Sequence, residues 1–234
     1  MKSISLNRIG ILQTGIVGAP LAEIHGEYPD MFQDMLGQDA FEYVTYPVVE
    51  GVFPEAPSEC DGWIITGSKH GAYETHDWIP PLEDFIRKLV AARIPTVGIC
   101  FGHQIMAQAL GGTVKKSPKG WGVGLQEYKD LKSGRVIRIR AFHQDQVIKC
   151  PPSATVTHTS EFCEFAGLQY SPNCVSLQPH PEHSAAFTSD LIEVRRNVAL
   201  PDTVADAAQS VNNNPDDHAE YSIIIKRILS AQSP

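Results

Sequence analysis

Apolar positions in the first half of the chain follow two different periods in turn, which predicts strands alternating with helices. Short apolar or alternating runs have the length and pattern of strands. These strands are expected at residues 8–15, 41–46, 62–66 and 96–99. Apolar residues at spacings of three and four predict helices at 30–36 and 78–93. Residues 16–29 are expected to form a loop, and the proline- and glycine-rich segment 49–59 a linker.

The pattern changes after Gly111-Gly112, where short runs broken by turn residues predict a series of brief strands. They are expected at 113–115, 124–128, 136–140, 155–159, 162–169 and 175–178. Helical spacing returns near the C-terminus, at 191–198, 203–211 and 219–229.

Alternating strands and helices predict an α/β fold, with an open and mostly parallel sheet flanked by helices. The second half is expected to add some antiparallel strands. We expect one domain over residues 1–234, with a core at about 8–195 and C-terminal helices within 203–230.

Composition narrows the classes of function. The net charge is −8, which argues against nucleic acid and membrane surfaces as partners. The sequence contains no apolar run of the roughly 20 residues that span a bilayer, and no signal-peptide core is evident. Five scattered cysteines without a C-x-x-C pair predict neither a disulfide framework nor a metal site. A cytoplasmic protein without metal or cofactor is the expectation.

Cys100 stands at a sharp break in the pattern. The apolar run 96–99 ends at this cysteine, Gly98 and Gly102 flank it, and a helical pattern begins directly afterwards. A strained turn between strand and helix requires such small neighbours. A thiol at a helix N-terminus is favoured as the thiolate. We therefore expect Cys100 to attack a carbonyl carbon.

A candidate base follows the short strand at 175–178. In Gln178-Pro179-His180-Pro181-Glu182, the side chains of His180 and Glu182 point to the same side of an extended segment. A carboxylate at this place can hold the imidazole in the tautomer that accepts a proton from a thiol. The H-P-E motif is a weak signal alone and a strong one together with the Cys100 turn.

These motifs resemble those of class I glutamine amidotransferase domains, in a stand-alone branch related to GMP synthetase. The family has a G-x-C-x-G-x-Q turn and a late H-P-E, here Gly98 to Gln104 and His180 to Glu182. Thr66-Gly67-Ser68 matches its earlier glycine-rich turn, and His143-x-Asp145-x-Val147 is similar to an H-x-D-x-V element of that branch. The resemblance spans about residues 8–195 and implies a flavodoxin-like fold.

The resemblance also implies roles for individual residues. Cys100 would form a γ-glutamyl thioester, His180 would protonate the leaving nitrogen, and Glu182 would orient His180. Backbone N–H groups of Phe101 and of Gly67 or Ser68 would hold the oxyanion. The expected substrate contacts are Gln104, Trp121, Gly122, Val123, His143 and Asp145.

The chain departs from the family pattern at Gly122, where many relatives carry an acidic residue. If that carboxylate shapes substrate recognition in the relatives, this pocket would hold its substrate differently. Free glutamine as the sole substrate is therefore an open question.

Three functions stay open. The first is a glutamine amidotransferase that hydrolyses glutamine and supplies ammonia to a separate synthetase, because the sequence contains neither a Walker-type loop nor an S-G-G-x-D-S-like loop. The second is a γ-glutamyl peptidase, whose leaving amine is larger and needs no ammonia channel. The third is a non-catalytic regulatory module, against which the intact Cys100, His180 and Glu182 argue.

Other polar side chains have simpler interpretations. His70, His76 and Lys69 are expected to be solvated loop residues, His103 to be structural, and His183 to end its motif. The remaining cysteines are expected to pack as small apolar residues.

Overall fold

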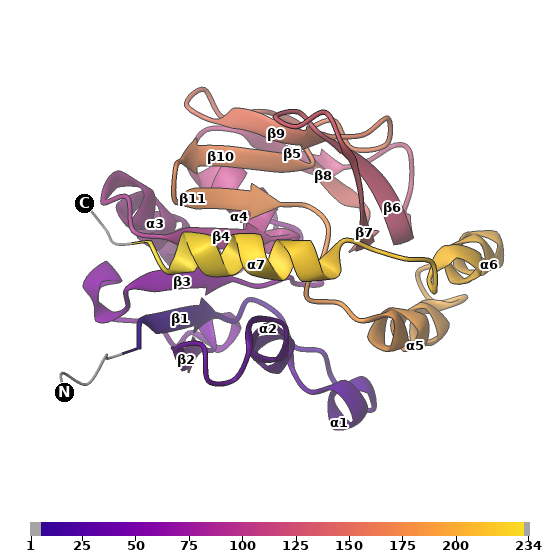
Figure 1. Cartoon of the computed structure of the whole chain (residues 1–234), viewed down its shortest axis with the longest axis horizontal. Helices are drawn as coiled ribbons and strands as arrows, with labels where there is room; N and C mark the ends of the chain where they lie inside the picture. The colour runs from indigo at the N-terminus through magenta and orange to yellow at the C-terminus, as the bar shows by residue number, and fades with distance from the viewer. Residues whose placement is uncertain (1–5, 232–234) are drawn as a thin grey trace.

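The computed structural model describes residues 6–231 as an α/β fold with a nine-stranded sheet between helices (Figure 1). Five adjacent strands are parallel. In spatial order they are β2 (Glu42–Tyr46), β1 (Arg8–Leu12), β3 (Gly62–Ile65), β4 (Thr96–Ile99) and β11 (Cys174–Leu177). Antiparallel strands continue the sheet: β10 (Gly167–Ser171), β9 (Thr155–Thr159), β6 (Gly122–Asp130) and β7 (Val136–His143). A separate antiparallel pair consists of β5 (Thr113–Lys116) and β8 (Asp145–Lys149).

Alternate side chains of the parallel strands face two different helical layers. Ile64 of β3 packs with α2 (Tyr28–Leu36) and α7 (His218–Leu229). Its neighbours Trp63 and Ile65 pack on the opposite face with α3 (Ile79–Ala91) and α4 (Phe101–Ala109). Figure 1 shows α2 and α7 on the near side of the sheet and α3 and α4 behind it. Because both faces are covered, the central strands β3 and β4 are buried along their whole length, as strands of parallel sheets usually are.

The predicted fold class is confirmed: the sheet is mostly parallel in the first half and antiparallel in the second. The cluster that contains α7 also contains Ile9 of β1, so the two ends of the described chain share one core. This supports the proposed single domain over 1–234. Within residues 6–231, we find no helix with the length and apolarity required to cross a bilayer.

Several predicted boundaries were wrong. The segment expected as a loop contains α1 (Leu21–His25), and the linker contains two short 3-10 turns, Val48–Glu50 and Pro57–Glu59. The strand expected at 162–169 begins only at Gly167, and β8 was not expected as a strand.

The helix expected at 191–198 is α5 (Ala185–Arg195), which begins and ends before its predicted bounds. Ser184 caps it by accepting a hydrogen bond from the Phe187 N–H at 3.0 Å. The Ser184 cap therefore sets where the helix begins, in place of the apolar spacing that predicted a later start. Val198, which the prediction placed in the helix, lies beyond its end and is exposed. The next helix, α6 (Asp202–Val211), agrees with its prediction.

The parallel strands β3, β4 and β11 end side by side. Ile65 pairs with Gly98, and Leu177 pairs with Ile99, so the residues after each strand meet at one edge of the sheet. Figure 1 shows α1, α5 and α6 gathered at the end to which β1 and β11 point. Ligands of open parallel sheets bind at this edge.

Candidate active site

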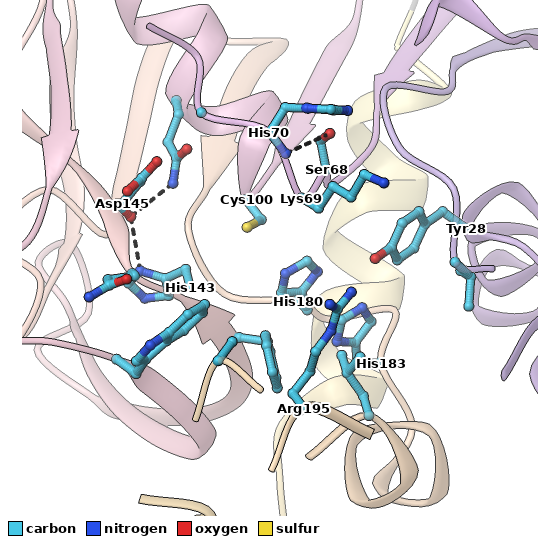
Figure 2. Close-up of a pocket in the computed structure, with 18 of the residues that line it drawn as sticks. Tyr28, Ser68, Lys69, His70, Cys100, His143, Asp145, His180, His183 and Arg195 are labelled. Carbon is cyan, nitrogen blue, oxygen red and sulfur yellow. Dashed lines mark hydrogen bonds between the residues drawn. The ribbon is translucent and has the colours of Figure 1, made fainter. Parts of the chain in front are cut away.

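Cys100 lies in a strained turn between β4 and α4. Its φ of 53° and ψ of −101° are unusual for a residue other than glycine and cost about 1–3 kcal/mol. The Cys100 N–H donates to Leu177 O at 2.8 Å, and the Gly102 N–H donates to Thr66 O at 3.1 Å. These bonds to the neighbouring strand ends hold the turn in place, with the Cys100 side chain at the cavity (Figure 2).

The turn depends on the absence of a side chain at Gly102. An added Cβ there would lie 2.3 Å from the carbonyl oxygen of Ile65, which is backbone and cannot rotate away. We therefore expect Gly102→Ala to push α4 from β3, to destabilise the fold by about 1–3 kcal/mol, and to slow any reaction at Cys100. Thermal unfolding and steady-state rates measure both effects; an unchanged melting temperature and rate would contradict this account of the turn.

His180 and Glu182 form a buried pair. His180 Nδ1 lies 2.7 Å from Glu182 Oε1, and both side chains are almost fully buried. The main-chain N–H of His180 donates to Arg140 O at 2.7 Å, which fixes the segment after β11. Burial by itself lowers the pKa of His180, but the charges of Glu182 and Cys100 outweigh it and raise the pKa well above its ordinary value. The raised pKa favours the imidazolium form of His180 at neutral pH.

His183 lies against His180, which the sequence did not predict. Their rings stack with centroids 3.8 Å apart and an angle of 7°. Burial and the nearby charges of His180 and Arg140 lower the pKa of His183 well below its usual value. A neutral ring therefore covers one face of the charged His180 and helps to fix its orientation.

The residues proposed for the oxyanion hole lie next to this pair. An added Cβ at Gly67 would be 2.9 Å from His180 Cε1 and 3.8 Å from Cys100 Cβ, so the main chain passes close to both. Ser68 lines the cavity. Phe101 is the first residue of α4, where an N–H has no acceptor within the helix.

The expected substrate contacts divide into two groups. Gln104, Trp121, His143 and Asp145 line the cavity beside Cys100. Gln104 Nε2 donates to Asp145 O at 2.9 Å, and His143 Nδ1 lies 3.1 Å from the same oxygen (Figure 2).

Gly122 and Val123 do not belong to the lining of that cavity. Val123 packs in an apolar cluster with Ile192 and Leu200. An added Cβ at Gly122 would lie 2.6 Å from the Phe162 ring, so this ring fills the space of an acidic side chain at that position. A substrate role for these two residues stays a prediction.

The cavity has a volume of about 340 Å³ and extends from the Cys100 turn to α5. Its acidic lining residues are Glu74 and Asp145, and burial raises the pKa of Asp145. Arg195 of α5 and Lys69 approach from other sides, and Figure 2 shows the Arg195 side chain reaching up beside His183. Arg195 was not among the site residues expected from the sequence, since the helix that carries it was expected to begin only at residue 191.

Comparisons with known proteins identify the family of the chain. The family model for glutamine amidotransferase class-I matches residues 43–192, more than half of the chain. Gamma-glutamyl peptidase 4 of Arabidopsis thaliana is 30% identical over 224 residues and 89% of each chain. A component of the glutamine-hydrolysing GMP synthase of Halobacterium salinarum is 25% identical over 68% of this chain and 85% of that protein.

A solved structure shares the fold. The crystal structure of a glutamine amidotransferase from Thermotoga maritima superposes with a TM-score of 0.76 at 20% identity, covering 96% of this chain and 99% of the other. At this identity, the likeness shows that the two chains share a fold. The chain belongs to the class-I glutamine amidotransferase family.

Proposed function

We propose that this chain hydrolyses γ-glutamyl amide bonds, with Cys100 as the nucleophile. The observation that carries the proposal is the position of His180, between the Cys100 side chain and the Glu182 carboxylate 2.7 Å away, at one cavity. A nucleophile, an acid–base group and an orienting carboxylate in this order are sufficient for acyl transfer. A non-catalytic module would not need a buried charged pair beside a strained cysteine.

The reaction proceeds in two steps. The Cys100 sulfur forms a bond with the γ-carbonyl carbon, and the carbon–nitrogen bond breaks as His180 gives its proton to the departing nitrogen. Water then attacks the thioester while neutral His180 takes a proton from it. The thiolate leaves, glutamate is released, and protonated His180 is ready for the next cycle.

The developing oxyanion requires hydrogen-bond donors at the turn. The N–H of Phe101 and those of Gly67 or Ser68 are the candidates, since all three residues lie at the strand ends beside Cys100. Donors that are already oriented lower the barrier without reorganisation during the reaction.

One feature of the cavity favours a leaving amine larger than ammonia. The cavity continues from Cys100 to Arg195, which makes no salt bridge with an acidic residue among residues 6–231 within 4.0 Å. A γ-glutamyl peptide whose leaving amine carries its own carboxylate matches this charge, and a relative over 89% of the chain is named a γ-glutamyl peptidase.

Arg195→Ala tests this preference. We expect kcat/KM for γ-glutamylglycine to fall about tenfold or more, because a charged hydrogen bond contributes about 1.5–3 kcal/mol. Hydrolysis of γ-glutamylmethylamide, which has no carboxylate on the leaving amine, should change little. Steady-state kinetics with both substrates measure the ratio of their kcat/KM values.

Arg196→Ala is the matched control. Arg196 is the next residue along the chain and is ion-paired with Glu193, Asp202 and Asp206, so it has the same charge but is held elsewhere. It should leave the substrate ratio unchanged. An equal loss on both substrates in Arg195→Ala, or none on either, would remove Arg195 from leaving-group recognition.

Ammonia supply to a separate synthetase is the second candidate. It is favoured by the similarity to the GMP synthase component of Halobacterium salinarum and by the His143-Gln144-Asp145 segment at the cavity. The same kinetic comparison separates the two candidates. Faster release of ammonia from glutamine than of the amine from γ-glutamyl dipeptides would favour ammonia supply as the function. The enzyme that accepts the ammonia would then be a separate partner chain.

A further inference from the structure

A second group of chemically active side chains lies in the loop between β3 and α3. His70 Nδ1 is 3.4 Å from Glu74 Oε2, and His76 Nε2 is 2.8 Å from the same oxygen. One ligand atom from each of the three residues lies within 4.8 Å of the other two. Both histidines were expected to be solvated loop residues. The sequence pattern could not show that they converge, because this depends on how the loop folds.

These separations suit a transition-metal ion. Zinc binds histidine nitrogen and carboxylate oxygen at about 2.0–2.2 Å, which places tetrahedral ligand atoms roughly 3.3–3.5 Å apart. The His70–Glu74 distance already has this value, and the His76–Glu74 distance of 2.8 Å needs to open by roughly 0.5–0.7 Å to reach it. Two imidazoles and one carboxylate favour zinc and its neighbours over magnesium and calcium, which prefer oxygen ligands.

The loop is held in shape by contacts behind the cluster. The His76 ring stacks on Trp78 with centroids 5.7 Å apart and an angle of 14°, and Trp78 is buried against Phe101. The Glu74 N–H donates to Gly71 O at 3.0 Å. The His70 ring also lies against Trp78, with centroids 5.8 Å apart, so both imidazoles occupy defined positions before any ion arrives.

We propose that His70, Glu74 and His76 bind a divalent transition-metal ion such as zinc at the rim of the Cys100 cavity. All three side chains are partly exposed, so an ion can enter from solvent. His70 and Glu74 also line the cavity. Three protein ligands leave a fourth position open for water or a ligand group.

The test is a zinc titration of the tag-free Cys100→Ser variant by isothermal calorimetry. Serine at 100 removes the thiolate, so zinc bound by Cys100 and His180 does not contribute. We expect saturable binding of one ion per chain and a zinc-dependent rise in melting temperature. His70→Ala or His76→Ala in the same background should weaken binding at least about tenfold, since loss of even a hydrogen-bond partner of a ligand costs about 10–100-fold.

Two further variants keep the test decisive. Glu74→Gln preserves the shape of the side chain but removes its charge, so it should weaken binding without unfolding the loop. His25→Ala removes another histidine, paired with Asp190 at 2.8 Å, and should leave binding unchanged. The proposal would be overturned if Cys100→Ser showed no saturable zinc binding. It would also be overturned if His70→Ala and His76→Ala bound zinc as tightly as Cys100→Ser alone, or if His25→Ala weakened binding as much as they do.

Discussion

Replacing Cys100 by alanine is expected to abolish hydrolysis of every γ-glutamyl substrate, with a loss of about 10⁴-fold or more in kcat. Loss of a nucleophile that acts together with its base removes the whole covalent pathway. The fold should persist, because alanine leaves the flanking glycines and the backbone hydrogen bonds of the turn unchanged. Product release measured with purified protein, alongside thermal unfolding, gives both quantities.

Cys150→Ala is the matched control for this variant. Cys150 is a partly exposed free cysteine that is not part of the cavity lining. Its removal should leave the rate unchanged, and an electrophilic glutamine analogue should label the control protein but not Cys100→Ala. Hydrolysis that survives in Cys100→Ala would eliminate the thioester mechanism, whichever amine leaves.

The fold and the centre of the candidate site could be predicted because they are encoded in short stretches. Four residues of strand, a cysteine between glycines and a helical pattern define the Cys100 turn within one segment of the chain. His180 and Glu182 are separated by a single residue. Parallel strand order then brings the two segments together at one sheet edge.

The remainder of the site depends on contacts between distant segments. Arg195 reaches the cavity only because α5 begins at its Ser184 cap, and the predicted helix was shifted. Phe162 fills the space beside Gly122 from a segment that was expected to be a strand. The stacking of His183 on His180 follows from the turn after Glu182, for which the sequence carries no periodic signal.

The cluster of His70, Glu74 and His76 is an intermediate case. Three residues of types that bind metals occur within seven positions, which is a visible signal. Their spacing fits neither one face of a helix nor one face of a strand, so periodicity could not bring them together. The turn at Gly71 and the stacking of His76 on Trp78 do so instead.

Glu182 controls the charge of His180 in the proposed reaction. The carboxylate accepts from His180 Nδ1 at 2.7 Å and stabilises the imidazolium. Together with the Cys100 charge it overcomes the effect of burial and raises the pKa of His180 to about 10. His180 can protonate a leaving amine only below this value, so hydrolysis should fall as pH rises through about 10.

Stability should follow the same titration. The folded-state pKa of His180 lies above the unfolded value of about 6.5. Its contribution to the free energy of unfolding is therefore fully present below about pH 6.5. That contribution is lost as pH rises towards about 10.

Glu182→Gln should lower kcat by about 10²–10⁴-fold, because the amide neither stabilises the imidazolium nor enforces the required tautomer. The rate that remains should decline at a lower pH than in the unaltered protein, since the charge that raised the pKa of His180 is gone. Rate–pH profiles of both proteins measure the shift. Glu193→Gln, an exposed change in α5, is the control and should keep the original profile. An alkaline limb that stays near pH 10 in Glu182→Gln would show that Glu182 does not set the charge of His180.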